Sequence, residues 1–188
     1  MIVGVDEAGR GPLAGVVTAC ALYLVKEPPF SVRDSKELSA VKREEMFPWL
    51  IDNALVCVGI ASPEEIDRYN ILEATMRAAN RAIRGLLAKS PKLARARFII
   101  DGNIFRTHLD IKYECIEKAD KTVKEVSCAS IVAKVTRDHL MSIADFLYPE
   151  WSFRQHKGYP TKEHFSLIKQ YPVSPLHRKS FFPCNQHR

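Results

Sequence analysis

The chain has 188 residues, enough to bury a sizeable core in one compact domain, and its composition is that of an ordinary soluble globular protein. No apolar run approaches the ~20 residues that cross a membrane, and no basic segment precedes an apolar stretch as in a signal peptide, so we expect a cytoplasmic protein without a membrane partner. The formal net charge is +6, and the whole excess lies in residues 154–188, so the basic character belongs to one segment.

Two carboxylates follow the first predicted strand. The apolar run over residues 2–5 predicts a buried strand, and Asp6 and Glu7 come directly after it. An unpaired buried carboxylate is costly, and a bound metal ion is one group that offsets the cost. Neighbouring side chains on a strand face opposite ways, so the two acids can share a site only where the strand ends or bends. The alternative to a metal site is an ordinary hairpin turn with a solvated acidic pair.

Gly9, Arg10 and Gly11 form the turn after these acids. Glycine tolerates positive φ, so the two glycines permit a bend and let a phosphate approach the backbone. The arginine between them can pair with the phosphate charge. The turn is neither a P-loop, because no Gly-Lys-Ser/Thr follows, nor the G-x-G-x-x-G dinucleotide fingerprint. It predicts contact with a nucleic acid.

Residues 13–25 are expected to form a second strand, joined to the first as an antiparallel hairpin. Ser39 then reads as the N-cap of a helix. Lys36, which lies in the loop before that cap, is a candidate phosphate contact, although a loop lysine is usually only solvated.

The middle of the chain predicts a strand and a long amphipathic helix. Residues 54–61 form the third strand, and Ser62, Pro63 and Glu65 carry the pattern of a capping box. Apolar residues then recur at spacings of three and four, which marks the buried face of a helix ending near residues 85–90. These residues are Leu72, Met76, Ala79, Ile83 and Leu86.

The strand predicted at residues 98–100 repeats the opening pattern, because it ends in Asp101 and a glycine. In open α/β sheets functional groups gather at the carboxyl ends of the strands. If this strand lies parallel to the first and next to it, Asp6 and Asp101 are roughly 5 Å apart. That spacing suits carboxylates that share metal ions.

Asp120 lies between a strand at residues 112–116 and a long helix expected from about residue 125 to 147. It could be a further metal ligand, or an acid placed favourably near the positive end of the helix. The helix is expected to be buried through six apolar residues, namely Cys128, Ile131, Val132, Val135, Ile143 and Phe146.

The final segment combines charge with aromatic rings. Residues 154–188 contain seven Lys and Arg and one acid, and Thr161 is expected to cap a last helix. Tyr159, held between Gly and Pro, could stack on a sugar or base or pack over that helix. Basic side chains with interleaved aromatics suit a nucleic-acid surface. The alternative is a basic tail docked by its aromatics.

The chain resembles bacterial ribonuclease HII, the type 2 ribonuclease H, through stretches that occur in the family's order along nearly its whole length. Small departures are Ala119, where many bacterial members have glycine, and Cys128 in the usual Ser-Ala-Ala-Ser run. The matching stretches are Val5-Asp6-Glu7-Ala8-Gly9-Arg10-Gly11-Pro12, Asp34-Ser35-Lys36, Ile100-Asp101-Gly102-Asn103, Lys118-Ala119-Asp120, the run from Ser127 to Asp138, His156-Lys157-Gly158-Tyr159-Pro160-Thr161 and His177-Arg178-Lys179-Ser180-Phe181.

The resemblance implies an α/β fold, a ribonuclease H-like mixed sheet flanked by helices with a helical C-terminal part. It also implies cleavage of RNA in RNA–DNA hybrids, including 5′ of single ribonucleotides within duplex DNA. Four carboxylates hold the metals in the family, and they map onto Asp6, Glu7, Asp101 and Asp120. Hard oxygen ligands favour Mg²⁺ or Mn²⁺ over zinc, and no Cys-x-x-Cys pair contradicts this. Two such ions can clamp an in-line displacement that leaves a 3′-hydroxyl and a 5′-phosphate.

The resemblance also implies how the substrate is read. The loop Gly9-Arg10-Gly11 would recognise the 2′-hydroxyl of the ribonucleotide, and Tyr159 would stack against the sugar at the RNA-to-DNA junction. The related ribonuclease HIII has Gly-Thr-Gly in that loop, so Arg10 favours type HII. We expect a monomer. The alternatives are a hybrid-binding protein with a structural metal, and a DNA nuclease or strand-transfer enzyme on the same scaffold.

Overall fold

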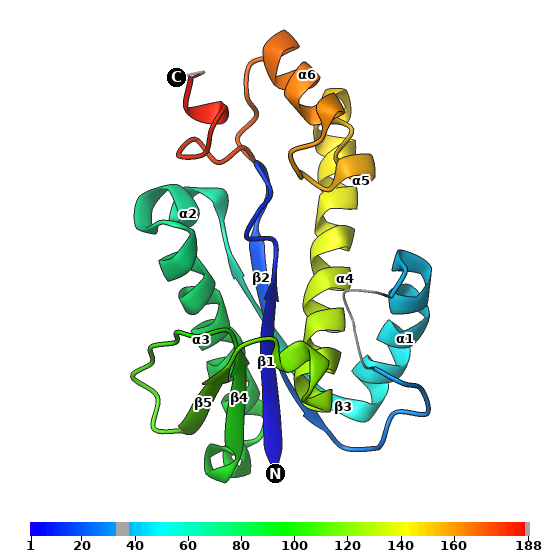
Figure 1. Ribbon diagram of the computed structural model, residues 1–188, viewed down its shortest axis with the longest axis vertical. Helices are drawn as coiled ribbons and strands as arrows, with labels where there is room; N and C mark the ends of the chain where they lie inside the picture. The colour runs from blue at the N-terminus through cyan, green and yellow to red at the C-terminus, as the bar shows by residue number, and fades with distance from the viewer. Residues whose placement is uncertain (33–37, 187–188) are drawn as a thin grey trace.

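The computed structural model describes residues 1–32 and 38–186, and its centre is a five-stranded mixed sheet (Figure 1). The strands are β1 (Ile2–Ala8), β2 (Val17–Leu24), β3 (Ala54–Ala61), β4 (Arg97–Asp101) and β5 (Lys112–Ile116), in the order β3-β2-β1-β4-β5. β1 pairs antiparallel with β2, as the hairpin prediction required, and parallel with β4. The expected mixed sheet is confirmed.

Helices cover both faces of this sheet (Figure 1). The helices are α1 (Ala40–Asn53), α2 (Pro63–Tyr69), α3 (Ile71–Lys89), α4 (Lys124–Leu147), α5 (Phe153–His156) and α6 (Lys162–Gln170), with short 3₁₀ turns η1 (Pro91–Arg95), η2 (Ala119–Lys121), η3 (Pro149–Trp151) and η4 (Cys184–Gln186). α3 packs on one face through a core that includes Ile83 and Leu86. α1 and α4 pack on the other through Leu50 and Ile131.

The local signals for helix starts hold. The side chain of Ser39 accepts the N–H of Lys42 at 3.3 Å, and Ser62 and Glu65 form a reciprocal capping box at the start of α2. One feature of this region was not expected. Asn70, with φ at +68°, separates α2 from α3 and caps the second helix by accepting the N–H groups of Leu72 and Glu73.

Two predicted strand boundaries are wrong. β1 does not end before Asp6, because regular pairing with β2 continues through Ala8. β2 begins at Val17, four residues later than expected, because the preceding segment bonds elsewhere. The N–H of Leu13 donates to the carbonyl of Gly158 at 2.8 Å, and that of Gly15 to the carbonyl of Leu176 at 2.8 Å. Contacts with the C-terminal part therefore override the apolar strand pattern.

The expected burial of α4 is right for its first half and wrong for Ile143 and Phe146, which are 57% and 73% exposed. This end of the helix extends beyond the sheet toward α5 and α6 (Figure 1). There only Met141 and Ala144 face a core, which they share with Trp151 and Phe153.

The C-terminal part packs against buried rings, although Tyr171 and Phe182 are 40% and 66% exposed. Trp151 and Phe153 are fully buried, and His164 and His177 lie against them. The rings of Trp151 and Phe153 both precede residue 154, so the docked-tail interpretation of residues 154–188 stays a prediction. All five cysteines have free thiols. In the part of the chain that the structure describes, no helix has the length and apolar character needed to cross a bilayer.

Candidate active site

The carboxyl ends of β1 and β4 bring two acids together. The parallel register pairs Val5 with Ile100, so Asp6 and Asp101 are the next residues on adjacent strands. Their predicted proximity required that β1 and β4 be parallel neighbours, and the structure meets this condition.

Asp6 is buried in an arrangement that disfavours its charge. The side chain is 2% exposed, and its Oδ1 accepts the N–H of Glu7 at 2.7 Å. The other oxygen, Oδ2, is buried and meets no hydrogen-bond donor among the described residues. Burial raises the pKa of Asp6 well above its ordinary value, and the charges of Glu7 and Asp101 raise it further, while Ser130 lowers it. A cation beside Oδ2 would reverse this penalty.

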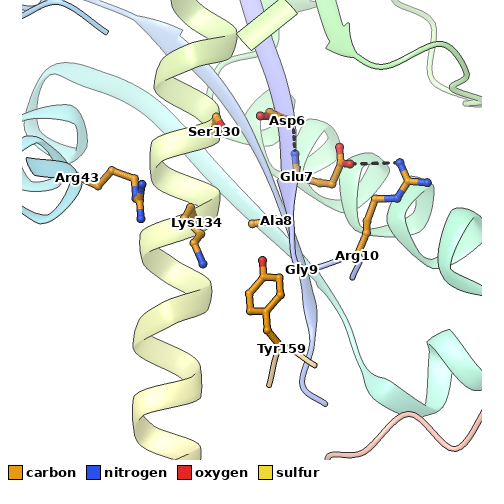
Figure 2. A pocket seen from close by; sticks show the side chains of 9 residues that line it. All are labelled: Asp6, Glu7, Ala8, Gly9, Arg10, Arg43, Ser130, Lys134 and Tyr159. Atoms are coloured by element: carbon orange, nitrogen blue, oxygen red, sulfur yellow. Dashed lines mark hydrogen bonds and ion pairs between the residues drawn. The ribbon is translucent and has the colours of Figure 1, made fainter. Parts of the chain in front are cut away.

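Glu7 leaves the strand on the other side of the backbone, because β1 continues through both acids. Its carboxylate turns toward Arg10, with Oε1 3.5 Å from Nη1, while Asp6 points toward Ser130 of α4 (Figure 2). The two acids therefore approach the site from different directions.

Asp101 and Asp120 are linked through the backbone. Asp101 Oδ1 accepts the N–H of Ala119 at 2.7 Å, which holds the turn η2 against the end of β4. Asp120 is only 1% exposed, and its carbonyl accepts the hydroxyl of Ser127 from the first turns of α4. The turn that carries Asp120 is thus fixed between β4 and α4, beside the strand-end acids.

A cavity of about 370 Å³ opens in front of the first acids (Figure 2). Four of its lining residues were not predicted as site residues, namely Ala8 from β1, Arg43 from α1, and Ser130 and Lys134 from α4. Lys134 donates to Asp138 Oδ1 at 2.8 Å, and its Nζ lies 5.1 Å from the centre of the Tyr159 ring. The i,i+4 spacing of Ser130 and Lys134 on one helix face was the available signal. The lining residues are Asp6, Glu7, Ala8, Gly9, Arg10, Arg43, Ser130, Lys134 and Tyr159.

The two glycines of the loop differ in what requires them. Gly9 has φ at +98°, and a Cβ there would lie 2.2 Å from Nε of Arg137, so the fold itself requires glycine. A Cβ on Gly11 would meet nothing within 4 Å. Gly11 therefore leaves an open approach to the backbone beside Arg10, whose side chain is 50% exposed.

Tyr159 lines the cavity from the opposite side to the strand ends (Figure 2). The ring is half-buried between the cations of Lys134 and Arg137, whose charged groups lie 5.1 and 5.5 Å from its centre. The structure thus gathers most of the predicted site residues at one place. The predicted contact Lys36 lies outside the described residues.

The four carboxylates suit a hard divalent cation chemically, and the buried Asp6 Oδ2 offers it an oxygen ligand. They are not gathered into one ligand set in this arrangement, in which Glu7 lies 3.5 Å from Arg10 and Asp101 accepts the N–H of Ala119. Accordingly, no three His, Cys, Asp or Glu side chains among the described residues are grouped closely enough to hold one ion.

Comparison with known proteins gives a consistent result. The family model of ribonuclease HII matches residues 3–184. Ribonuclease HII of Thermotoga maritima is 48% identical over 183 residues, covering 97% of this chain and 74% of the relative. That of Vibrio parahaemolyticus is 49% identical over 188 residues, covering 99% and 86%.

Solved structures share the fold. Ribonuclease H2 of Pyrococcus horikoshii superposes with a TM-score of 0.72 at 26% identity, over 98% of this chain and 95% of the other. Bst ribonuclease HIII in complex with Mn²⁺ gives a TM-score of 0.76 at 16% identity, over 99% of this chain and 68% of the other.

Proposed function

The chain belongs to the ribonuclease HII family, and we propose that Asp6, Glu7, Asp101 and Asp120 form its catalytic and metal-binding centre. It is a ribonuclease H type endonuclease, which cleaves the RNA strand of RNA–DNA hybrids and acts at ribonucleotides embedded in duplex DNA. In our proposal a water oxygen bonds to the phosphorus on the 5′ side of the ribonucleotide. The O3′–P bond breaks, which leaves a 3′-hydroxyl and a 5′-phosphate.

The cofactor in this proposal is Mn²⁺ or Mg²⁺, as one or two ions. Carboxylate oxygens are the ligands that these cations prefer, and Bst ribonuclease HIII, which has the same fold, was solved in complex with Mn²⁺. When bound, the ions would activate water and stabilise the leaving oxygen. The residues that would hold them are Asp6, Glu7, Asp101 and Asp120, of which Asp6 has a buried oxygen that meets no donor among the described residues.

The residues around the cavity bind and orient the duplex. The open backbone at Gly11 and the exposed guanidinium of Arg10 receive the ribose hydroxyl and the adjacent phosphate. The Tyr159 ring stacks on the sugar at the junction, and Lys134 supplies a cation for a phosphate. The observation that carries the proposal is that Asp6 and Glu7, Gly9 and Arg10 of the loop, and the Tyr159 ring line one cavity (Figure 2).

The first test is a gel assay on duplex DNA that contains one ribonucleotide, with Mn²⁺, with Mg²⁺ and with chelator. We expect metal-dependent cutting on the 5′ side of the ribonucleotide. Cutting of long hybrids alone would remove the junction role from Gly9, Arg10, Gly11 and Tyr159. Cutting of an all-DNA duplex would favour a DNA nuclease, and no cutting by folded protein would favour a hybrid-binding protein. Gel filtration alone and with the duplex checks the expected monomer.

A further inference from the structure

Two buried arginines contact the Gly9–Gly11 loop, and the reaction proposed above gives them no role. Arg137 lies in α4 and Arg178 in the C-terminal segment, and both are 0% exposed. Neither has a carboxylate within ion-pair distance among the described residues. Burying a guanidinium without an opposite charge is costly, so the groups that replace water around each one must be good acceptors.

Apart from the carbonyl of Lys157, those acceptors are backbone carbonyls of residues 9–16. Arg178 donates from all three of its nitrogens and encloses the loop from behind. Its acceptors are the carbonyls of Gly9 at 2.5 Å, Pro12 at 2.7 Å, Arg10 at 2.9 Å, Gly15 at 3.0 Å and Val16 at 3.4 Å. A planar fork with five N–H donors suits this fan of carbonyls, whereas lysine offers three donors from one point.

Arg137 joins the same loop to the other wall of the cavity. Its Nε donates to the carbonyl of Val16 at 2.9 Å and its Nη1 to that of Lys157 at 2.9 Å, while its guanidinium lies 5.5 Å from the Tyr159 ring centre. Gly9 packs directly on it, since a Cβ there would lie 2.2 Å from Nε. One side chain thus contacts both the loop and the tyrosine segment.

The other supports of the segment between the acids and β2 come from α4 and the C-terminal part, against which Leu13 and Ala14 are buried. Residues 9–16 are not part of any strand pairing with β1 or β3, and their remaining backbone bonds run to Gly158, Leu176 and Arg178. The backbone N–H of Arg178 itself donates to the carbonyl of Leu13 at 2.8 Å. The position of the loop therefore depends on the two arginines and on the C-terminal part that they contact.

We propose that Arg137 and Arg178 are positioning residues that set the distance between the Gly9–Gly11 loop and the Tyr159 ring, and thereby the preference for a ribonucleotide embedded in DNA. The inference rests on the proposed function, in which this loop and ring read the junction. A displacement of the order of 1 Å at such a site can cost about a hundredfold in rate. In the proposed function the Tyr159 ring stacks at the RNA-to-DNA junction, which an embedded ribonucleotide presents and the interior of a long hybrid lacks, so the loss is larger for the former.

The test uses Arg178→Lys and Arg137→Lys in the full chain, with Leu86→Ala as a control that opens the α3 core away from the site. We expect each lysine variant to lose about tenfold to a hundredfold in kcat/KM on the embedded ribonucleotide, and several-fold less on a long hybrid. Activities are normalised to the folded fraction. After this normalisation Leu86→Ala should leave the ratio of the two activities unchanged, and so should the lysine variants if the arginines have a merely structural role.

A double-mutant cycle with Arg10→Ala tests whether Arg178 acts through the loop. We expect Arg10→Ala to cost several-fold less in the Arg178→Lys background than in the original chain, because the loop is already displaced. Additive losses, equal losses on both substrates, or failure of both lysine variants to fold would overturn the proposal. If the unmodified chain cuts neither substrate, the proposed function fails instead, so the two failures are distinguishable.

Discussion

The strand-end acids and the loop-holding arginines both bury charge, and they differ in how that charge is satisfied. Asp6 keeps one buried oxygen that no donor reaches among the described residues. Arg137 and Arg178 have a carbonyl for each of their three nitrogens. An unsatisfied buried charge is costly to the fold, whereas a satisfied one stiffens it. We therefore infer that Asp6 is arranged to accept a cation, whereas the two arginines bind the backbone of the chain itself.

The largest effect on cleavage should come from Asp6→Asn, which removes the buried carboxylate. We expect a loss of cleavage on the order of a thousandfold or more, because the neutral amide is a poor ligand for a divalent cation. In chelator the same variant should melt at or above the temperature of the original chain, since a buried charge has been removed. Cleavage rates and thermal melting measure both. Normal activity in the folded variant would remove Asp6 from the site.

The strand-end acids could be predicted from the sequence, whereas the contacts of the two arginines could not. The acids follow apolar strands, and a strand that ends in Asp is a local pattern, so the parallel pairing of β1 with β4 was the only long-range assumption. The arginine contacts join residues more than 120 positions apart, such as Arg178 with Gly9 and Arg137 with Val16. No periodicity reveals such a pair. That is why the start of β2 was misplaced, and why the contacts of Arg178 with the Gly9–Gly11 loop were not predicted.

Acidification should lower the free energy of unfolding through two buried histidines of the C-terminal part. Burial lowers the pKa of His164 to about 4 and that of His177 to about 3, from the ordinary 6.5. Stability is complete above pH 6.5 and falls below it, because the unfolded chain takes up protons that the folded chain refuses. From pH 7 to pH 5 the two histidines should together cost about 3 to 4 kcal/mol of unfolding free energy.

Urea titrations at several pH values measure this slope. His177→Asn should reduce the slope by about half, since one of the two buried rings is removed. His139→Gln is the matched control, because that ring is 51% exposed and lies on the surface of α4 beside Glu44. An equal slope in both variants would show that the buried pair is not its source.

The two loop glycines allow an effect on the stability of the fold to be separated from an effect on substrate recognition. Gly9→Ala should destabilise the fold, by about 1 to 3 kcal/mol, because its φ is +98° and Arg137 fills the space of the Cβ. Gly11→Ala should leave the melting temperature unchanged, since nothing lies within 4 Å of its Cβ. It should still lower kcat/KM on the embedded ribonucleotide about tenfold by obstructing the approach of the ribose. Full activity of Gly11→Ala would mean that the substrate does not approach this backbone.

The smallest effect concerns which basic side chains meet the duplex. Lys134 lines the cavity beside the acids. Arg84 is exposed on α3, where the nearby Arg77 and Arg81 form ion pairs with Glu73 and Glu65. Lys134→Gln should raise KM about threefold and reduce the slope of log affinity against log salt by about one, as expected for a lost phosphate contact. Arg84→Gln should change neither. If the two variants lowered the salt dependence of affinity equally, the duplex would contact α3 as well. The surface that binds the duplex would then not be confined to the cavity between β1 and α4.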